Sequence, residues 1–438
     1  MRPCGSIDES GLRNASRHRH KCEVLRRVCF LDATLYPLAA GPDADHARKV
    51  ADNLIVRSAF GSHQTFAFSH LHALTSPAAG SPAAALLDRV AVDTLSQCIP
   101  LVWVPVWAFS FADSFASSLV PIDELQSAGL VDEHVQLRPD LWAWPRSKNP
   151  IYKMIATLSS QPVRTLRELA PKYSDEQMRR SVAAGTASRQ AVPQCYERVV
   201  LCQFRSTFDP YEPPMAPWRA GQRVAESALS KRPVSVSRAI AASDAIARHA
   251  RELRVLFVNR TRTKFSRSLS NMGYLLRQCN QGSRRWQPPG WKIICRAHEF
   301  GATGLEHDIR AARRADVLVG THGAGLANAF FMRRGAALVE VRPYHFEGPW
   351  PDKYFRSWSA LEQSVHYYQV TSGSPELSVP RPESNVTVWD ARDHAVRLPW
   401  RTLREVLAAI ISVGASREAY VRLLWAQGTV FTSFAKQQ

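Results

Sequence analysis

Residues 316–343 read DVLVGTHGAGLANAFFMRRGAALVEVRP, and this stretch decides the fold of the second half of the chain. An apolar run of strand length, DVLVGT, leads into a turn that contains His322, Gly323 and Gly325. The segment GLANAFFM follows, and then a second apolar run, AALVEVRP. The pattern predicts a strand, a glycine turn, a short helix and a second strand parallel to the first.

The same alternation continues on both sides of this stretch. The predicted strands are LRVLFVNR (253–260), WKIICR (291–296) and HYYQV (366–370). The predicted helices are LSNMGYLLRQC (269–279), LEHDIRAARRA (305–315) and DKYFRSWSALEQ (352–363). Strands and helices that alternate through short loops are typical of an α/β protein with a doubly wound, mostly parallel sheet.

The glycine turn has the features of a phosphate-binding site. The first turn of a helix leaves backbone N–H groups unpaired, and the helix dipole places a partial positive charge there. Gly323 and Gly325 have no Cβ, so the backbone can approach an anion closely, and His322 projects from the strand end. Glycine turns between a strand and a helix are also common without any ligand. No G-x-G-x-x-G pattern and no Walker A sequence occurs, which disfavours a dinucleotide oxidoreductase and an ATPase.

The length of 438 residues predicts more than one domain. We expect an irregular N-terminal segment at 1–50, a first α/β domain at 51–235, a second at 236–398, and a closing amphipathic helix within 399–438. The polar first twenty residues contain no targeting segment. The most apolar run, IPLVWVPVWAFSFA at 99–112, is too short to span a bilayer, so a membrane anchor would have to lie upstream of Met1.

The formal net charge of +18 favours anionic partners, which include nucleic acids, sulfated glycans and nucleotides. The basic residues are mostly arginines, and they are scattered along the whole chain without a block of five. This distribution disfavours a dedicated nucleic-acid surface.

The eight cysteines contain no C-x-x-C pair, which excludes the usual zinc-ribbon spacing. Two cysteine pairs share a seven-residue offset, Cys22 with Cys29 and Cys195 with Cys202. Three N-x-[ST] sequons begin at Asn14, Asn259 and Asn385. Sequons and an even cysteine count favour an oxidising secretory compartment, whereas eight buried thiols in a reduced chain remain the alternative.

The glycine turn also carries a resemblance to a known family. The pattern V-G-x-H-G-A-G-L-x-N, followed by a short helix and G-A-x-x-x-E, resembles the signature of glycosyltransferase family 61. The strand that ends in V-N-R, with the basic loop after it, resembles a second family segment, and Cys22 with Cys29 resembles an N-terminal cysteine motif. The resemblance is specific over about 250–370 and looser before it.

The resemblance implies the glycosyltransferase B architecture, in which two Rossmann-like domains face each other across a cleft. It implies inverting transfer of GlcNAc, xylose or arabinose from a UDP-sugar to a hydroxyl of a glycan or glycoprotein, in the lumen of the Golgi or endoplasmic reticulum. The implied donor-binding residues are Arg260, Arg267, Asn271, His322, Gly323, Ala324, Gly325, Asn328 and Glu340. We expect the two arginines to grip the diphosphate and Glu340 to accept hydrogen bonds from ribose hydroxyls.

The expected general base departs from the family pattern. The family has N-F-x-H-x-x-x-[DE] in its first domain, and the counterpart here is SFADSFAS at 110–117. Asp113 therefore stands in place of the histidine and is the candidate catalytic base, and Ser117 stands in place of the acid. A second departure is His307-Asp308-Ile309, where the family has an acid, a glutamine and an apolar residue. These departures leave open a weak or silent family member that binds a nucleotide-sugar or glycan.

No D-x-D metal motif lies near the expected donor site, so a divalent metal is possible but not required by any motif. Asp43-Ala44-Asp45 is interpreted as a solvated segment. His70 and His72 alternate on a strand-like segment and are weak candidates for metal ligands.

Overall fold

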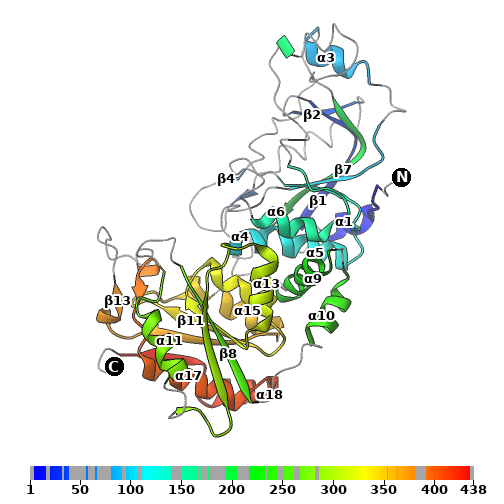
Figure 1. Cartoon of the computed structure of the whole chain (residues 1–438). Coiled ribbons are helices and arrows are strands. Elements are labelled where there is room, and N and C mark those ends of the chain that lie inside the picture. The colour runs from blue at the N-terminus through cyan, green and yellow to red at the C-terminus, as the bar shows by residue number, and fades with distance from the viewer. Residues whose placement is uncertain are drawn as a thin grey trace. The chain divides into compact units, whose positions relative to one another are not determined.

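The computed structural model describes most of the second half of the chain and parts of the first. The described residues are 4–15, 20–31, 34–38, 56–57, 65–66, 80–90, 95–103, 105, 111–139, 150–165, 168, 176–177, 193–204, 217–231, 234–244, 251–260, 267–281, 286–352, 354–362, 364–379 and 391–434. The chain divides into two compact units, Met1–Glu212 and Pro213–Gln438 (Figure 1). The segments Asp43–Asp45, His70–His72 and the Asn385 sequon lie outside the described residues.

The second unit contains a six-stranded sheet in the order β15-β12-β11-β10-β8-β9. Every neighbouring pair in it is parallel, as the sequence predicts. Its strands are β8 (Glu252–Val258), β9 (Lys292–His298), β10 (Val317–Thr321), β11 (Ala337–Arg342), β12 (His366–Ser372) and β15 (Val430–Ser433). Buried Val and Leu dominate β8, β10 and β11, because helices cover both faces of a parallel sheet.

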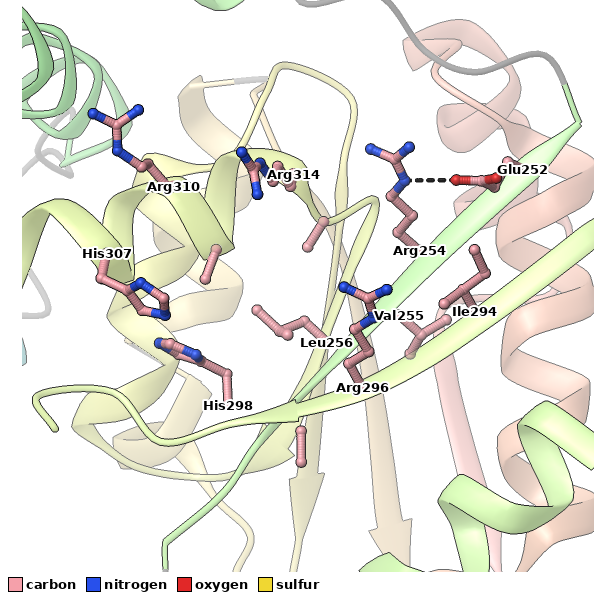
Figure 2. A pocket seen from close by; sticks show the side chains of 13 residues that line it. Glu252, Arg254, Val255, Leu256, Ile294, Arg296, His298, His307, Arg310 and Arg314 are labelled. Carbon is pink, nitrogen blue, oxygen red and sulfur yellow. Dashed lines mark hydrogen bonds and ion pairs between the residues drawn. The ribbon is translucent and has the colours of Figure 1, made fainter. Parts of the chain in front are cut away.

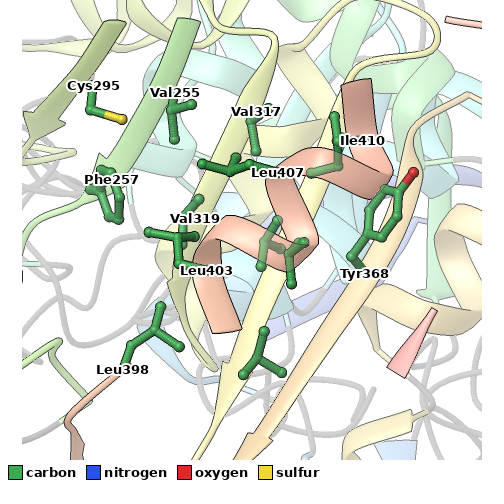
Figure 3. Packing of buried hydrophobic residues seen from close by; sticks show 14 of the residues in the cluster. Val255, Phe257, Cys295, Val317, Val319, Tyr368, Leu398, Leu403, Leu407 and Ile410 are labelled. Carbon is green, nitrogen blue, oxygen red and sulfur yellow. The ribbon is translucent and has the colours of Figure 1, made fainter. Parts of the chain in front are cut away.

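Helices from the chain's C-terminal part cover one face of this sheet. They are α17 (Trp400–Val413) and α18 (Arg417–Ala426), together with α11 (Met272–Gln281). Figure 3 shows Leu403, Leu407 and Ile410 of α17 over the valines of β8 and β10. α17 is the amphipathic helix expected after residue 398, and α18 and the strand β15 follow it within 399–438. Each buried leucine contributes about 1.5–3 kcal/mol of apolar burial.

The other face of the sheet carries a different set of helices. These are α9 (Pro217–Ser230), α13 (Leu305–Arg314), the 3₁₀ helix η4 (Ala324–Phe331) and α15 (Phe355–Glu362). Trp218 and Gln222 of α9 donate side-chain hydrogen bonds to the Met332 carbonyl at 2.9 Å, and this ties α9 to the end of η4. The remaining elements of the unit are α10 (Val236–Asp244), α14 (Pro349–Asp352), η5 (Pro375–Leu377), β13 (Ser378–Val379) and β14 (Ala395–Val396).

The first unit has a mixed five-stranded sheet in the order β2-β1-β7-β5-β6. Its strands are β1 (His20–Leu31), β2 (Thr34–Pro37), β5 (Pro100–Trp103), β6 (Gln136–Pro139) and β7 (Gln194–Phe204). β1 runs antiparallel to β2 and β7, whereas β5 is parallel to β6 and β7. A separate hairpin pairs β3 (Val56–Arg57) with β4 (Thr65–Phe66).

Short helices complete the described part of the first unit. They are α1 (Glu9–Ala15), α3 (Pro82–Leu87), α4 (Phe111–Ser114), the π-helical η2 (Phe115–Leu119), α5 (Val120–Ser127), α6 (Pro150–Ile155) and η3 (Ala156–Leu158). The long apolar run at 99–112 contains the strand β5 at Pro100–Trp103, and its last two residues begin α4. Among the described residues, no helix has the length and apolar composition needed to cross a bilayer.

The described part of segment 1–50 is not irregular, which corrects the expectation from sequence. β1 is a twelve-residue strand whose apolar side chains are buried, from Cys22 to Leu31. The basic residues Arg26 and Arg27 interrupt its apolar pattern, and Arg27 has a positive φ of 50°. A local irregularity of this kind breaks the alternation by which a strand is predicted from sequence.

All eight cysteines form disulfide bonds. The two seven-residue offsets arise because β1 and β7 are antiparallel: Cys22 pairs with Cys202, and Cys29 pairs with Cys195. The other bridges are Cys4–Cys98 and Cys279–Cys295. This arrangement contradicts the reduced-chain alternative and is typical of proteins that fold in an oxidising compartment.

Candidate functional site

The strand order of the second unit defines where a ligand crevice lies. β9 and β10 lie on opposite sides of β8, so the direction of strand addition reverses between β8 and β10. The helix that follows β8 covers one face of the sheet, and the helix that precedes β10 covers the other. Open α/β sheets bind ligands at such a switch point, beyond the carboxyl ends of the strands. Arg260 follows β8 there, and His322 and Gly323 follow β10.

The glycines of the turn allow β8 and β10 to approach each other closely. A Cβ on Gly323 would lie 2.6 Å from Arg260 Nη1, and the φ of Gly323 is 150°. A Cβ on Gly325 would lie 2.9 Å from Val258 Cγ1, and one on Gly320 would lie 2.9 Å from Val258 Cβ. Gly323 therefore makes room for a guanidinium group. Gly325 makes room for the end of β8, which is a packing role distinct from the expected approach to an anion.

A cluster of arginines lies beside Gly323. Arg267 Nε is 2.9 Å from the Asp393 carboxylate, and Arg392 Nε is 3.0 Å from the same carboxylate. The Thr321 hydroxyl donates to the Arg267 carbonyl and so anchors this segment to the end of β10. Burial, and then the neighbouring Arg267, lower the pKa of Arg260 to about 10, with Asp393 opposing the shift. The guanidinium groups of all three arginines still carry their charges at neutral pH.

The cluster has more positive than negative charge. Within the described segments, Arg267 and Arg392 form ion pairs with the Asp393 carboxylate, and Arg260 lies in the field of the same group. Arg260 Nη1 is buried and has no hydrogen-bond partner among the residues that the structure describes. A buried guanidinium N–H without a partner is costly, and an anion with free oxygens would satisfy it. The charge balance and this unsatisfied donor make the turn the candidate anion site of the second unit.

His322 is held by a carboxylate on the neighbouring strand. Its Nδ1 lies 2.5 Å from Glu340 Oε1, and its backbone N–H donates to the Val341 carbonyl at 3.0 Å. The imidazole ring packs against Phe346 and Phe355, with ring centroids 4.8 and 5.9 Å away. Burial lowers the pKa of His322, and the Glu340 carboxylate only partly offsets this shift. His322 is therefore neutral at pH 7, with its Nδ1 proton directed to Glu340.

Glu340 is fully buried, and both of its oxygens are occupied. Arg342 donates to Oε2 from Nε at 3.0 Å and from Nη2 at 2.8 Å, and the Tyr367 hydroxyl also donates to it. Burial alone would raise the pKa of Glu340, but Arg342 and His322 outweigh burial and lower it to about 2. Glu340 orients His322 and is not accessible to a ribose hydroxyl. Its role therefore differs from the one that the sequence predicted.

The network continues to the protein surface. Arg342 Nη1 lies 2.6 Å from the half-buried Asp352 carboxylate in α14. The Tyr367 hydroxyl lies 3.2 Å from Gln369 Oε1, and Gln369 in turn donates to Thr371 at 2.9 Å. Polar side chains on one face of β11 and β12 thus form a buried hydrogen-bond network that extends to His322.

The remaining expected donor residues have structural roles. The Asn271 side chain donates to the Leu398 carbonyl at 2.8 Å and accepts from the Leu398 N–H at 3.1 Å, so it fixes the segment before α17. Asn328 is buried and donates to the Gly325 carbonyl at 2.9 Å, which closes the first turn of η4. Ala324 begins η4. None of these contacts is with a residue of the arginine cluster.

Sequence reasoning missed Arg342, Tyr367, Arg392 and Asp393. A signal for the first two exists: the strands EVR and YYQVT place polar residues at every second position within otherwise apolar segments. Such alternation in a strand that is buried on both faces marks a polar network. Arg392 and Asp393 had no local signal, because they follow a segment without any strand or helix pattern.

Asp113 lies in the first unit, at the third residue of α4. Ser117, in the adjoining π-helix, is buried. The departure at His307-Asp308 is also accounted for: the buried Asp308 lies 2.8 Å from His298 Nε2 and accepts the Gly301 N–H at 2.8 Å. In the part of the chain that the structure describes, no three His, Cys, Asp or Glu side chains gather as a metal site.

The sequence that forms this site also matches a known protein family. The sequence model of the family described as Glycosyltransferase 61 matches residues 144–339. The match supports the resemblance of this chain to glycosyltransferase family 61. The matched region contains Arg260, Arg267 and the glycine turn, and it ends one residue before Glu340. The chain matches no curated protein.

Proposed function

We propose that this chain is a family 61 member and transfers GlcNAc, xylose or arabinose from a UDP-sugar to a hydroxyl of a glycan or glycoprotein, with inversion at the anomeric carbon. The proposal includes the glycosyltransferase B arrangement that the family resemblance implies. The observation that carries it is the buried Arg260 donor against Gly323, in a cluster with excess positive charge at the switch point of the sheet. Such a cluster suits a nucleoside diphosphate.

In the proposed reaction, Arg260 and Arg267 compensate the charge that develops on the leaving diphosphate. The bond between the anomeric carbon and the diphosphate oxygen breaks, and its electron pair leaves with UDP. The acceptor oxygen forms the new bond from the opposite side, and its proton passes to the Asp113 carboxylate. Neutral His322, fixed by Glu340, lines the donor side without adding another cation.

We also propose that the protein works in the lumen of the Golgi or the endoplasmic reticulum. Four disulfide bonds support this location, because such bonds persist in oxidising compartments.

The first experiment measures thermal stability with UDP, UDP-GlcNAc, UDP-xylose, UDP-arabinose and GDP. A ligand at one hundred times its Kd adds about 2.7 kcal/mol to the free energy of unfolding. We expect uridine nucleotides to stabilise the wild type but not Arg260→Ala or His322→Ala. Arg277→Ala, an exposed change on α11, is the matched control. Absence of stabilisation by every uridine nucleotide would remove the proposed donor site.

A silent relative that binds nucleotide-sugar without turnover is the second candidate, because Asp113 and Ser117 replace the family's histidine and acid. Transfer assays with the stabilising donor separate the two functions. If Asp113 is the base, Asp113→Asn lowers kcat about 10²–10⁴-fold and leaves UDP binding unchanged. Asp88→Asn, an exposed aspartate at the end of α3, should change neither quantity. UDP binding without any transfer in wild type would favour the silent relative.

A further inference from the structure

A second pocket lies away from the anion site, between α13 and the strands β8 and β9. Its volume is about 520 Å³, which is within the range of small-molecule sites. Figure 2 shows its aliphatic floor, with Leu256 and Ile294, and the basic side chains around it. Four arginines from three elements line it: Arg254 of β8, Arg296 of β9, and Arg310 and Arg314 of α13.

The charges of this pocket are poorly balanced. Glu252 is its only acidic lining residue, and it lies 2.7 Å from Arg254 Nε. Arg310 reaches Glu306 only at 3.9 Å, and both side chains are about half exposed. Arg296 and Arg314 form no ion pair with any residue that the structure describes. The pocket therefore retains at least two uncompensated guanidinium groups above an apolar floor.

The arginines at the amino end of this pocket lie away from the diphosphate site. Arg254 precedes Arg260 by six residues along β8, which is about 20 Å of extended chain. Arg314 lies at the carboxyl end of α13, next to the amino end of β10, whereas the glycine turn follows the carboxyl end of β10. A diphosphate bound at Gly323 therefore cannot reach Arg254 or Arg314, although His298 extends the pocket to the carboxyl end of β9.

We propose that this pocket binds a sulfated or phosphorylated sugar of the acceptor glycan, at a docking site remote from the transfer reaction. Planar guanidinium groups bind the oxygens of sulfate and phosphate through paired N–H donors. The aliphatic floor of Leu256 and Ile294 provides an apolar surface for the C–H face of a sugar ring. The inference that the ligand belongs to the acceptor rests on the proposed function. The inference that the ligand is an anionic sugar rests on the side chains that line the pocket.

The test is direct binding of a fluorescent sulfated hexasaccharide to the full chain. We expect Arg296→Glu/Arg314→Glu to weaken binding by about tenfold or more, because each change removes a charge-assisted contact. The matched control is Arg277→Glu/Arg404→Glu, which changes the net charge by the same amount. Both of its arginines are exposed, on α11 and α17, and these helices cover the opposite face of the sheet. The control should bind as the wild type does, and wild-type affinity should fall as salt rises.

Three results would overturn the proposal. Equal weakening in both double variants would assign binding to net charge alone. Equal affinity for the desulfated hexasaccharide would show that the anionic group is not recognised. Saturation by inorganic phosphate without any binding of the sulfated sugar would assign the pocket to free phosphate. UDP-dependent stabilisation, measured in the same variants, tests the donor site separately and should persist in Arg296→Glu/Arg314→Glu.

Discussion

His322 directly follows β10, Glu340 lies on the neighbouring parallel strand β11, and the imidazole Nδ1 lies 2.5 Å from the Glu340 carboxylate. Gly320 is the register partner of Glu340 and has no side chain, so nothing on β10 comes between the two groups. The Glu340 carboxylate, which Arg342 keeps ionised, therefore orients the histidine of the glycine turn. Five predictions follow from this pair and from the features around it.

Glu340→Gln should destabilise the protein by about 3–5 kcal/mol, because it leaves Arg342 buried without its negative partner. Urea unfolding at pH 7 measures this cost. Glu405→Gln is the control: it breaks an exposed pair with Arg401 on α17 and should cost less than about 1 kcal/mol. Equal costs for the two variants would mean that the buried network contributes no more than a surface pair.

Stability should fall as the pH falls, in two steps. Burial lowers the pKa of His322 below its usual 6.5, so the unfolded state binds the proton first and stability declines below about pH 6.5. The pKa of Glu340 falls from 4.5 to about 2, so its contribution of about 3 kcal/mol is present above pH 4.5 and is lost towards pH 2. Urea unfolding across pH 3–8 measures both steps. His322→Gln should remove the first step and also reduce the second, because His322 helps to lower the pKa of Glu340; an unchanged profile in that variant would contradict this assignment.

Gly323→Ala should abolish nucleotide-dependent stabilisation. Its Cβ would lie 2.6 Å from Arg260 Nη1, at a φ that side chains rarely adopt. Gly348→Ala separates the two causes, because Gly348 also has a positive φ, of 104°, but has no atom near its Cβ position. We expect it to lose about 1–2 kcal/mol of stability and to keep UDP binding. Thermal shifts with and without UDP distinguish the variants.

The two bridges between β1 and β7 should contribute non-additively. The variant Cys29→Ala/Cys195→Ala removes one bridge but opens only a short loop, because Cys22–Cys202 still joins the strands. We expect this variant to lose about 3 kcal/mol of the free energy of unfolding. Removing the second bridge as well opens a loop of more than 150 residues and should cost about 5 kcal/mol more. Unfolding of the single-bridge and double-bridge variants under non-reducing conditions tests this order. Equal, additive costs would contradict it.

Asn271→Asp should lower stability without lowering the affinity for UDP. The aspartate cannot donate to the Leu398 carbonyl, and the lost contact and the repulsion together cost about 1–3 kcal/mol. UDP titration below the unfolding temperature measures the affinity of the folded protein. An affinity loss as large as that of Arg260→Ala would return Asn271 to the set of donor-binding residues.

The sequence predicted the second unit well because its signals are local. Each strand and helix from Leu253 to Val370 has its own periodicity, and glycine marks the turn after Thr321. The sequence did not predict the hydrogen bonds and ion pairs between residues that lie far apart in the chain. Asn271 with Leu398, and Arg267 with Asp393, lie more than 120 residues apart and pair only after β8 and the segment before α17 meet.

Glu340 illustrates a different limit. A carboxylate near a strand end can face a ligand or a buried cation, and only the position of Arg342 and Tyr367 decides between them. In the first unit, β1 was missed because Arg26 and Arg27 fall in the middle of the strand, where the antiparallel pairing with β7 overrides local pattern.

The placement of α17 and β15 has a consequence for biosynthesis. The face of the six-stranded sheet that α11 covers in part stays without α17 until residues 400–413 have left the ribosome, and the sheet gains β15 only after residue 433. β1 likewise waits for β7, more than 160 residues later, before either of its cysteines can find its native partner. Each unit therefore exposes apolar surface or unpaired cysteines during part of its synthesis, and such surfaces favour aggregation of a nascent chain until their partners arrive.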